Sequence, residues 1–550
     1  MKKTYLLTTI VIFALAIAGC QKGFLNQSVN PNTPSSATPQ DLLAGALQSS
    51  TTTTNGSQYL KFGIWCGYFA PSGSYVPSTT TLTMNFSNTS YNEFNFYYTN
   101  LTNYNLLIQD GAANPSLVNF AAIGKIMTAY CYEMLVDNYN DVPYSQALNI
   151  NQYMFPAYDK GPAIYADLLK QLDAAITMVN TSATNPGISD IYFGGNMASW
   201  QKFANFLKLR IAIRQSNLTS LTAGLQTEVK STASYGYLDD NTNVSAQPGY
   251  INSTFAGGQY APFWANWGIS AAGSYEPDYL EYVANNFYVN MLVGYNDTLR
   301  LKQVYQPTLL TTQKSGTVVP DNVSQIVGQI FGSNTQLSNS NTSAIGFGLI
   351  QSPSMAQPVV QGSEACFLMA EGVLEGYVAG PVSGAGSAQD YYQRGITASF
   401  KQLNVPNYAA AATAYYSQPI VDVNWAASAA ALAPSDKVAG VQTNANGTMP
   451  AGTALQRAII TQKYISLIGF GFFEAYNEYR RTGMPNLLSP SALQPAGART
   501  QQPGALGTGV APNRIYFPST ETTTNAAAVA AEPAVNPFTS LIFWARNINP

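Results

Sequence analysis

The chain has no histidine among its 550 residues, and this absence excludes several classes of enzyme. Ser-His-Asp and Cys-His catalysis both use an imidazole as the general base. The HExxH zinc motif and other histidine-ligated metal sites use it as a ligand. Any enzyme built on this chain would therefore have to work with carboxylates, tyrosine or lysine.

Charged residues are also scarce. They make up 10% of the chain, against about 25% in an ordinary soluble domain. The formal net charge is -3, and no cluster of lysine and arginine offers the phosphate contacts that nucleic acid requires. We expect no nucleic-acid partner. A polar surface of Tyr, Asn, Thr, Ser and Gln suits neutral ligands rich in hydroxyl groups.

Cysteine is rare as well, with four residues in the whole chain. Beyond Cys20 the remaining three are Cys66, Cys131 and Cys366, and their spacing shows no CxxC pair that would indicate a zinc site. Cys131 and Cys366 lie inside apolar helical patterns, which favours buried thiols over a disulfide. The sequence predicts no metal site and no cofactor.

Apolar runs of membrane-spanning length are missing too. Leu6–Ala18 is apolar over about 13 residues, short of the about 20 that span a bilayer. Lys2 and Lys3 precede it, as in the charged start of a secretory signal. The sequence therefore predicts a signal peptide over residues 1–19.

Cys20 directly follows the small residues Ala18 and Gly19. This order predicts cleavage before Cys20 and lipidation of its thiol, in preference to an ordinary signal peptide with a chance cysteine. Stable anchoring takes two or more acyl chains. Residues 20–40 are rich in Pro, Ser, Asn and Thr, which predicts a flexible tether. Residues 41–550 then form a single domain.

Apolar periodicity predicts an all-α fold with few short strands. Several predicted helices pair across short breaks, as in tetratricopeptide hairpins, although no period of about 34 residues is present. Long stretches rich in Gly, Asn, Thr and Ala separate them, and we expect these loops to carry function. The predicted helices span Ser116–Tyr139, Gly161–Asn180, Met197–Ser216, Gly362–Val378, Ala388–Leu403 and Ala454–Tyr479, and the loops span 231–275, 305–345, 405–450 and 490–530.

Five ordered segments across the mature chain resemble the SusD/RagB family of nutrient-binding outer-membrane lipoproteins. Each segment alone is a weak signal, and their order makes the resemblance specific. Asn140 where the family usually has Gly, and Tyr476 where it usually has Trp, are departures that affect local geometry. The segments are Cys20 with Phe24–Asn26 and Asn30–Asn32; Leu135–Tyr144 with Ala157–Asp159; Asp190–Gly194 with Trp200–Arg210; Ser363–Glu371 with Tyr392–Phe400; and Gln462–Pro485 with Arg514–Pro518.

The resemblance implies a SusD-like fold, in which a tetratricopeptide-like helical scaffold carries long ligand-binding loops. It also implies a non-catalytic protein on the cell surface, held in the outer membrane by its lipid. In the family such a protein captures oligosaccharides, or sometimes peptides, and acts as the lid of a TonB-dependent (SusC-like) transporter. The signal alone does not distinguish the two sides of that membrane.

Several charged residues in these segments also have simple structural roles. We expect Arg480 and Arg481 to form buried ion pairs with Glu364, Glu371 or Glu474, because guanidinium groups match carboxylates in two-pronged contacts. Asp137 and Asp141 are expected to clamp the turn that follows them. A calcium site there is the weaker alternative, since no full DxDxDG loop is present.

Aromatic residues on glycine-rich loops are the candidates for glycan binding, because sugar CH faces stack on rings while hydroxyls bond to amides. Many of these rings must instead fill the core, since 12% of the chain is aromatic. Tyr275, Tyr279 and Trp425 are weaker candidates. The predicted ligand-binding residues are Trp65, Tyr68, Tyr75, Tyr260, Trp264, Asn266 and Trp267.

Two other functions remain open from the sequence. A surface glycoside hydrolase would need two carboxylates about 5 to 9 Å apart across a cleft, and the 28 acidic residues do not exclude such a pair by number. A structural adaptor would bind only protein through its helical hairpins.

Overall fold

The structure is a computed structural model of the chain. Residues 1–36 lie outside the part that it describes, and with them the predicted signal peptide and Cys20. The described residues are 37–75, 84, 86–253, 259–308, 325–333, 337–431, 454–487 and 511–548.

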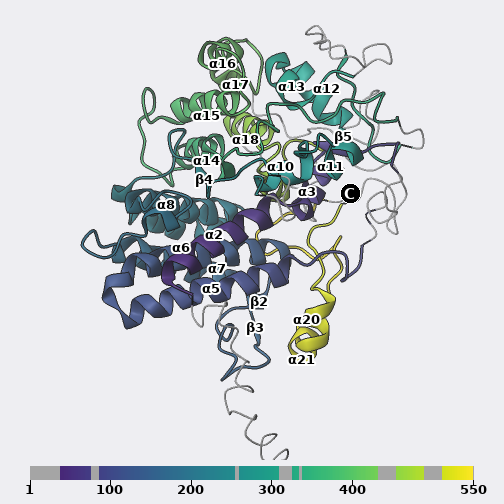
Figure 1. Cartoon of the computed structure of the whole chain (residues 1–550). Coiled ribbons are helices and arrows are strands. Elements are labelled where there is room, and N and C mark those ends of the chain that lie inside the picture. The colour runs from purple at the N-terminus through teal and green to yellow at the C-terminus, as the bar shows by residue number, and fades with distance from the viewer. Residues whose placement is uncertain are drawn as a thin grey trace, which may run out of the picture.

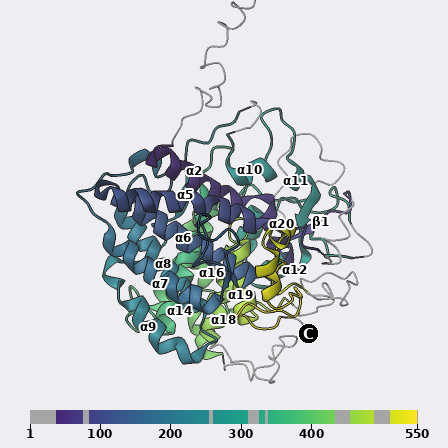
Figure 2. The same ribbon diagram turned by 90° about the horizontal axis from the view of Figure 1, so that it is seen from below.

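The first half of the chain builds a block of packed helices, drawn in purple to blue in Figure 1. Consecutive helices are neighbours in space: α5 packs on α6, α6 on α7 and α7 on α8. Figure 2 shows the same helices from below, again side by side. The helices are α2 (Pro39–Asn55), α5 (Glu93–Ala113), α6 (Val118–Tyr139), α7 (Gly161–Met178), α8 (Met197–Arg214) and α9 (Thr222–Lys230).

A second group of helices, green to yellow-green in Figure 1, continues this block. α14 packs against α15 and α18 of its own group and against α8 of the first group, so one core runs through both. The helices are α14 (Gly362–Leu374), α15 (Ala388–Gln402), α16 (Tyr408–Tyr416), α17 (Trp425–Ala430), α18 (Ala454–Ser466) and α19 (Phe472–Thr482).

Local sequence signals explain where these helices begin and end. The side chains of Thr38, Asn196 and Ser387 each accept a hydrogen bond from a backbone N–H in the first turn of α2, α8 and α15, respectively. α6 ends at Asn140, whose φ is 67°, and α19 ends at Gly483, whose φ is 74°. Both residue types tolerate the positive φ that turns the chain out of a helix.

Three short antiparallel ribbons lie in the described part of the chain, and the first and third of them join segments that are far apart in the sequence. They pair β1 (Phe69–Pro71) with β5 (Tyr282–Ala284), β2 (Val142–Pro143) with β3 (Tyr158–Asp159), and β4 (Val244–Ala246) with β6 (Gln357–Val360). The β1–β5 ribbon joins the first of the two aromatic loops singled out from the sequence to the segment that follows the second.

Short elements fill the loop side of the molecule and the C-terminal segment. The α-helices there are α3 (Leu60–Trp65), α10 (Pro262–Trp267), α11 (Pro277–Glu281), α12 (Asn286–Gly294), α13 (Thr298–Val304), α20 (Ser519–Thr524) and α21 (Ala526–Ala531). The 3₁₀ turns are η1 (Ser57–Tyr59), η2 (Pro115–Leu117), η3 (Gly187–Ser189), η4 (Thr219–Leu221) and η5 (Ala233–Tyr235).

The all-α prediction is confirmed, and five of the six predicted helices are present with small shifts at their ends. The single helix predicted over Ala454–Tyr479 is wrong. It consists of α18 and α19, separated by a break at Gly469, whose φ is 89°. The apolar pattern runs on through this break because both helices bury nearly all of their residues.

Other boundaries also differ from those expected. α2 and α5 were not among the predicted helices. α2 already begins at Pro39, inside the range predicted to be the tether. The predicted loop 405–450 contains α16 and α17. No helix in the described ranges combines the length and apolar character needed to cross a membrane.

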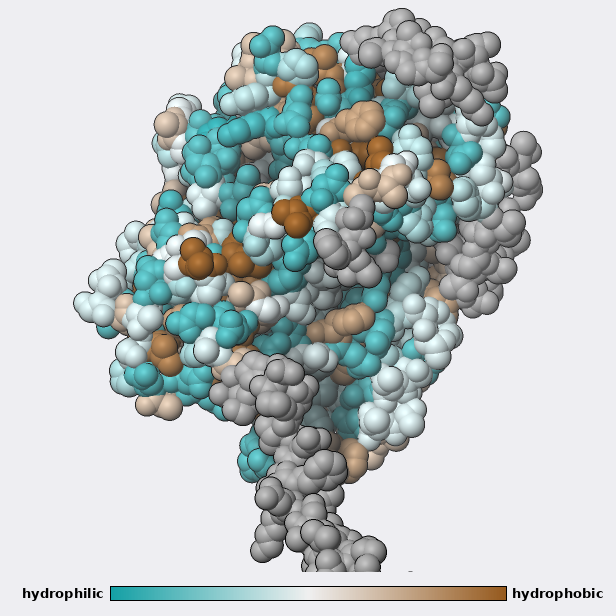
Figure 3. Space-filling model, viewed as in Figure 1, coloured by the Kyte–Doolittle hydropathy of each residue, from teal (hydrophilic) through white to brown (hydrophobic). Residues whose placement is uncertain are grey.

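The surface is polar without being highly charged. On the face drawn in Figure 3, hydrophilic and intermediate side chains predominate, and apolar side chains form small separate spots. All three described cysteines, Cys66, Cys131 and Cys366, are buried, and none forms a disulfide. This confirms the expectation for Cys131 and Cys366.

Candidate ligand-binding face and its support

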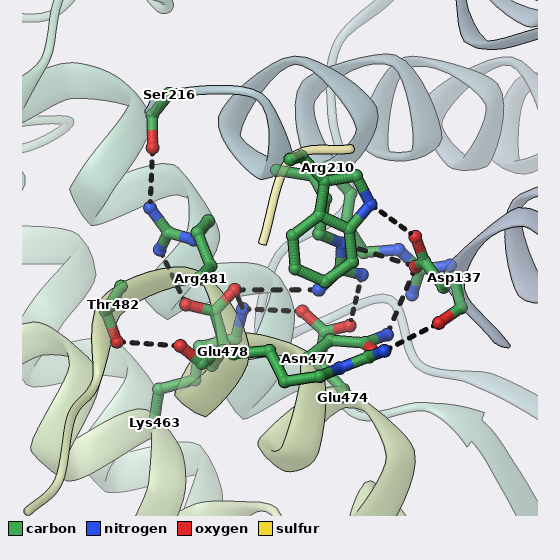
Figure 4. Close-up of polar contacts among 12 residues, drawn as sticks. Asp137, Arg210, Ser216, Lys463, Glu474, Asn477, Glu478, Arg481 and Thr482 are labelled. Atoms are coloured by element: carbon green, nitrogen blue, oxygen red, sulfur yellow. Dashed lines mark hydrogen bonds and ion pairs between the residues drawn. The ribbon is translucent and has the colours of Figure 1, made fainter. Parts of the chain in front are cut away.

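A network of buried charges holds the two helix groups together. It links α6, α8, α14, α18 and α19 through contacts of 2.5 to 3.9 Å between charged groups. Figure 4 shows several of these side chains converging between the helices. The cations are Arg210, Arg214, Lys463 and Arg481, and the acids are Glu133, Asp137, Glu364, Glu371, Glu474 and Glu478.

Arg214 lies at the centre of this network. Its guanidinium is 2.7 Å from Glu474 and 3.4 Å from Asp137, and its side chain is 2% exposed. Arg210, one turn earlier on α8, holds Glu133 with two parallel hydrogen bonds of 2.8 and 2.7 Å. Such two-pronged pairs fix geometry as well as charge, so α8 is locked in position against α6 and α19.

The acids of the network outnumber its cations, and their pKa values shift in opposite directions. Burial raises the pKa of Glu364 to about 7 and, against the pull of Arg214, that of Asp137 to about 6. Glu474 is equally buried, yet Arg214 and Lys463 hold its pKa well below the usual range. Burial therefore outweighs the nearby cations at Glu364 and Asp137, whereas the cations outweigh burial at Glu474.

The predicted ion pairs are partly confirmed. Arg481 contacts Glu371 at 2.8 Å. The prediction for Arg480 is wrong: it donates to the carbonyl oxygens of Asp137 and Asn513, because neighbouring cations already take the carboxylates. Glu364 and Glu474 do form buried pairs, with Arg210 and Arg214 on α8.

Asp137 and Asp141 differ in what they clamp. Asp141 accepts a 2.9 Å hydrogen bond from the backbone N–H of Gly161, so it clamps the start of α7, 20 residues further along the chain, and not only the turn that follows it. Asp137 instead accepts from Tyr165 and from the indole of Trp544. Within the described ranges, no group of three or more Cys, Asp or Glu side chains is arranged to hold a metal ion.

Three of the predicted ligand-binding aromatics lie in the core. Trp65, Tyr68 and Trp267 are 4%, 0% and 2% exposed. Tyr68 stacks on Tyr464 at 4.6 Å and donates its hydroxyl to the carbonyl of the same residue. Trp65 packs edge-on against Phe62. Protein atoms cover these rings, so in this conformation a sugar cannot stack on them.

Trp264 and its neighbours lie closer to the surface. Trp264 is half-buried, and its indole N–H donates to the carbonyl of Ile269 at 3.0 Å. A Cβ on Gly268 would lie 2.4 Å from the indole ring, so only glycine allows this ring position. Tyr260 accepts a hydrogen bond from the backbone of Ala271, and Asn266 donates to its own helix at Pro262.

Tyr275 and Tyr279 form a flat aromatic step beside this loop. Their rings are 4.2 Å apart and 11° from parallel. Tyr275 is 48% exposed, and Gln306 donates to the hydroxyl of Tyr279 and so fixes the inner ring. The sequence made these two tyrosines the weaker candidates, yet Tyr275 is more exposed than the predicted Trp65, Tyr68 and Trp267. Their spacing of four residues around Pro277 was the only signal of a stack.

The two predicted aromatic loops meet where Phe69 of β1 packs on Trp267, with ring centroids 4.7 Å apart. The β1–β5 ribbon continues from this contact. In its register Pro71 pairs with Tyr282, and the next residue, Ser72, donates from its backbone to Glu281 at 2.8 Å. The chain after Pro71 leads to Tyr75, which is 37% exposed. We call the set Tyr75, Tyr260, Trp264, Tyr275 and Tyr279 the loop face.

One acidic group is buried beneath the loop face. Asp278 is 9% exposed, and its Oδ2 atom has no hydrogen-bond partner. Burial, with a smaller contribution from Glu281, raises the pKa of Asp278 to about 7. A carboxyl group of this kind stores a free-energy cost at neutral pH.

The chain matches a known family over most of its length. Residues 31–518 match the SusD-like family described as "Starch-binding associating with outer membrane". No curated protein matches the chain.

Many solved structures share the fold. A chitin-binding protein is 23% identical, with a TM-score of 0.64, over 92% of this chain and 100% of its own. A SusD homologue from Bacteroides uniformis is 22% identical, with a TM-score of 0.63, over 92% and 99%. A Bacteroides vulgatus protein described as a putative outer membrane protein, probably involved in nutrient binding, is 21% identical, with a TM-score of 0.65, over 90% and 96%. With its helical scaffold, its loop face and a family match that spans both, this chain belongs to the SusD-like family of outer-membrane-associated nutrient-binding proteins.

Proposed function

We propose that this protein is a cell-surface lipoprotein that captures oligosaccharides on its loop face and delivers them to a TonB-dependent outer-membrane transporter as its lid. Cys20 carries the lipid, and the protein faces the cell exterior. Capture needs no catalysis, so the protein is not an enzyme. The exposed, hydrogen-bonded aromatic step of Tyr275 and Tyr279 beside Trp264 is the observation that supports glycan binding most directly.

The chemistry of the loop face suits a neutral sugar. Exposed rings offer apolar faces to sugar CH groups. Asn266 and the surrounding backbone offer donors and acceptors for hydroxyl groups. Trp65, Tyr68 and Trp267 act behind this surface, because they support the loops from the core.

The direct experiment measures affinity for a panel of neutral oligosaccharides by calorimetry. Trp264→Ala should weaken binding by about 1–3 kcal/mol, the range for loss of one stacked ring. Trp425→Ala is the matched control, since Trp425 is also half-buried but packs at a tilt against Tyr392 of the scaffold. Equal effects of the two substitutions would refute the assignment of the loop face.

A backbone variant sharpens the same test without removing the ring. In Gly268→Ala the added methyl group would occupy the space of the Trp264 indole and displace it. Binding should fall as in Trp264→Ala, while circular dichroism of the helices stays unchanged. Retained affinity would show that the position of the indole does not matter.

Anchoring and delivery are tested separately. Cys20→Ser should release the protein from the membrane fraction, and pull-down of the native protein should recover a β-barrel transporter. Co-purification with such a barrel but no affinity for any oligosaccharide or peptide would favour the adaptor alternative.

The two remaining alternatives have their own outcomes. Release of reducing ends from a glycan, lost on substitution of one Asp or Glu, would establish the hydrolase. Binding of peptides but not glycans by the loop face would keep the capture role and replace the ligand.

A further inference from the structure

A groove runs along α6 between α5 and α7, outside the loop face. Its volume is about 540 Å³, within the about 300–1,000 Å³ of small-ligand sites. The excursion between β2 and β3, residues 144–157, forms one of its walls. Buried apolar surface of Ala129, Tyr132 and Leu168 lines the groove between the helices.

One side of the groove carries a chain of hydrogen bonds. The ammonium of Lys125 donates to Oε1 of Gln171 at 2.8 Å. The Nε2 of Gln171 donates to Asp167 at 3.3 Å, and the hydroxyl of Tyr144 donates to the same oxygen at 2.6 Å. This chain fixes the orientation of the Gln171 amide and holds Lys125 at the groove. Asp167 already accepts two hydrogen bonds. In this series of hydrogen bonds the Gln171 side chain stands between Asp167 and the Lys125 ammonium.

Lys125 has no carboxylate within ion-pair distance in the described part of the chain, although it is half-buried. An ammonium has three donors and no acceptor. With one donor used by Gln171, two remain for a ligand. In a protein with a net negative charge, a positioned and unneutralised cation favours an anionic group in the groove.

The other groups that line the groove are uncharged. The amides of Asn105, Gln109 and Asn151 make no hydrogen bond to the described residues, so their donors and acceptors are available to a ligand. At the rim Ile150 is 72% exposed. None of the lining residues belongs to a strand, so an extended peptide would find no strand edge to pair with.

We propose that this groove is a second binding site, which takes a hexuronic acid residue of an acidic oligosaccharide. One such ring carries the three features that the groove matches. Its carboxylate pairs with Lys125, its hydroxyl groups bond to the free amides and to Gln171, and its CH face packs on Ile150 and the apolar floor. The site is separate from the loop face and does not depend on the function proposed for it.

The test compares galacturonic acid disaccharide with the corresponding neutral galactose disaccharide, both titrated into the purified protein. The acidic disaccharide should bind at least about tenfold more tightly, as a charge-assisted hydrogen bond allows. Its affinity should fall as salt is added, because salt screens a partly exposed charge. Lys125→Met should abolish the difference between the two sugars.

Matched variants locate the site. Lys170→Met removes an exposed lysine of α7 that does not line the groove, and it should leave binding unchanged. Trp264→Ala should also leave it unchanged, while Gln171→Leu should weaken it about tenfold. These variants keep helical residue types, and thermal melts confirm that they are folded.

Three results with the sugars would overturn the proposal. They are equal affinity for the acidic and neutral sugars, equal effects of Lys125→Met and Lys170→Met, and failure of both galacturonic and glucuronic acid disaccharides to bind at millimolar concentration. Tighter binding of a short peptide through its terminal carboxylate, lost in Lys125→Met, would also overturn it, because the class of ligand would then be wrong.

Discussion

The helical scaffold and the loop face use charge in opposite ways. The scaffold buries six carboxylates and four cations in one network, although only 10% of the chain is charged. The loop face presents exposed rings, and Asp278, buried beneath them, has an unpartnered oxygen. The first arrangement fixes the packing of helices, and the second leaves polar and aromatic surface available.

The difference follows from the cost of burying charge. A buried ion pair gains little over an apolar pair of the same shape, but removal of one partner leaves the other uncompensated. The network therefore allows few other packings of α8 against α6 and α19. A binding face built from rings and amides has no such constraint and can differ between relatives that share the fold.

The largest effect is expected at the centre of the network. Arg214→Met keeps the aliphatic stem but leaves Glu474 and Asp137 without their shared cation. The free energy of unfolding should fall by about 3–5 kcal/mol. Urea unfolding followed by circular dichroism measures this value.

The control is an ion pair that solvent reaches. Arg394 contacts Asp239 and Asp240, and its side chain is 28% exposed. Arg394→Met should cost only about 0–1 kcal/mol. If both arginines cost the same, burial does not determine what the network contributes.

The sequence predicted the scaffold better than the loop face, for a physical reason. α6 is apolar nearly all round, and Asn140 and Pro143 end it, so local pattern was sufficient to place it. The burial of Trp65 and Tyr68 depends on contacts with segments hundreds of residues away, namely with Tyr476 and Tyr464. The composition of a loop carries no record of those contacts.

The break at Gly469 shows the same limit within the scaffold. Residues 467–471 continue the apolar pattern, so the pattern does not show the break. Gly469 has a positive φ, and Leu349 lies 2.7 Å from where a Cβ would be, so both the backbone and the packing favour glycine there. The Arg481 and Glu371 pair was predicted with both partners. The partners of Glu364 and Glu474 were not, because Arg210 and Arg214 lie on α8, 154 and 260 residues earlier in the chain, and no local pattern reveals such a pairing.

A smaller effect is expected beneath the loop face, and it depends on pH. The folded protein binds the Asp278 proton more tightly than the unfolded chain does, since the pKa rises from 3.8 to about 7. The stability from this group is therefore full below about pH 4 and is lost as the pH rises to about 7. Asp278→Asn should remove this dependence and raise the free energy of unfolding at about pH 8 by about 1–3 kcal/mol.

Unfolding curves at several pH values measure the Asp278 effect, with Asp110→Asn at the end of α5 as the control. An unchanged pH profile in Asp278→Asn would mean that the carboxyl group finds a partner in solution. The scaffold, whose buried charges are paired, and the loop face, whose buried carboxyl group is not, would then differ less than the structure indicates.

The smallest effect on stability is expected at the surface of the loop face. Tyr275 is 48% exposed and stacks on Tyr279, so Tyr275→Ala should change the free energy of unfolding by no more than about 0.5–1 kcal/mol. The same change should weaken binding of a neutral oligosaccharide by about 1–3 kcal/mol. Trp65→Ala provides the opposite case: its ring is 4% exposed, so its loss should cost about 3–5 kcal/mol of stability. A Tyr275→Ala protein that unfolds as readily as Trp65→Ala would show that the exposed step supports the fold, and the division of labour between rings that bind and rings that pack would fail.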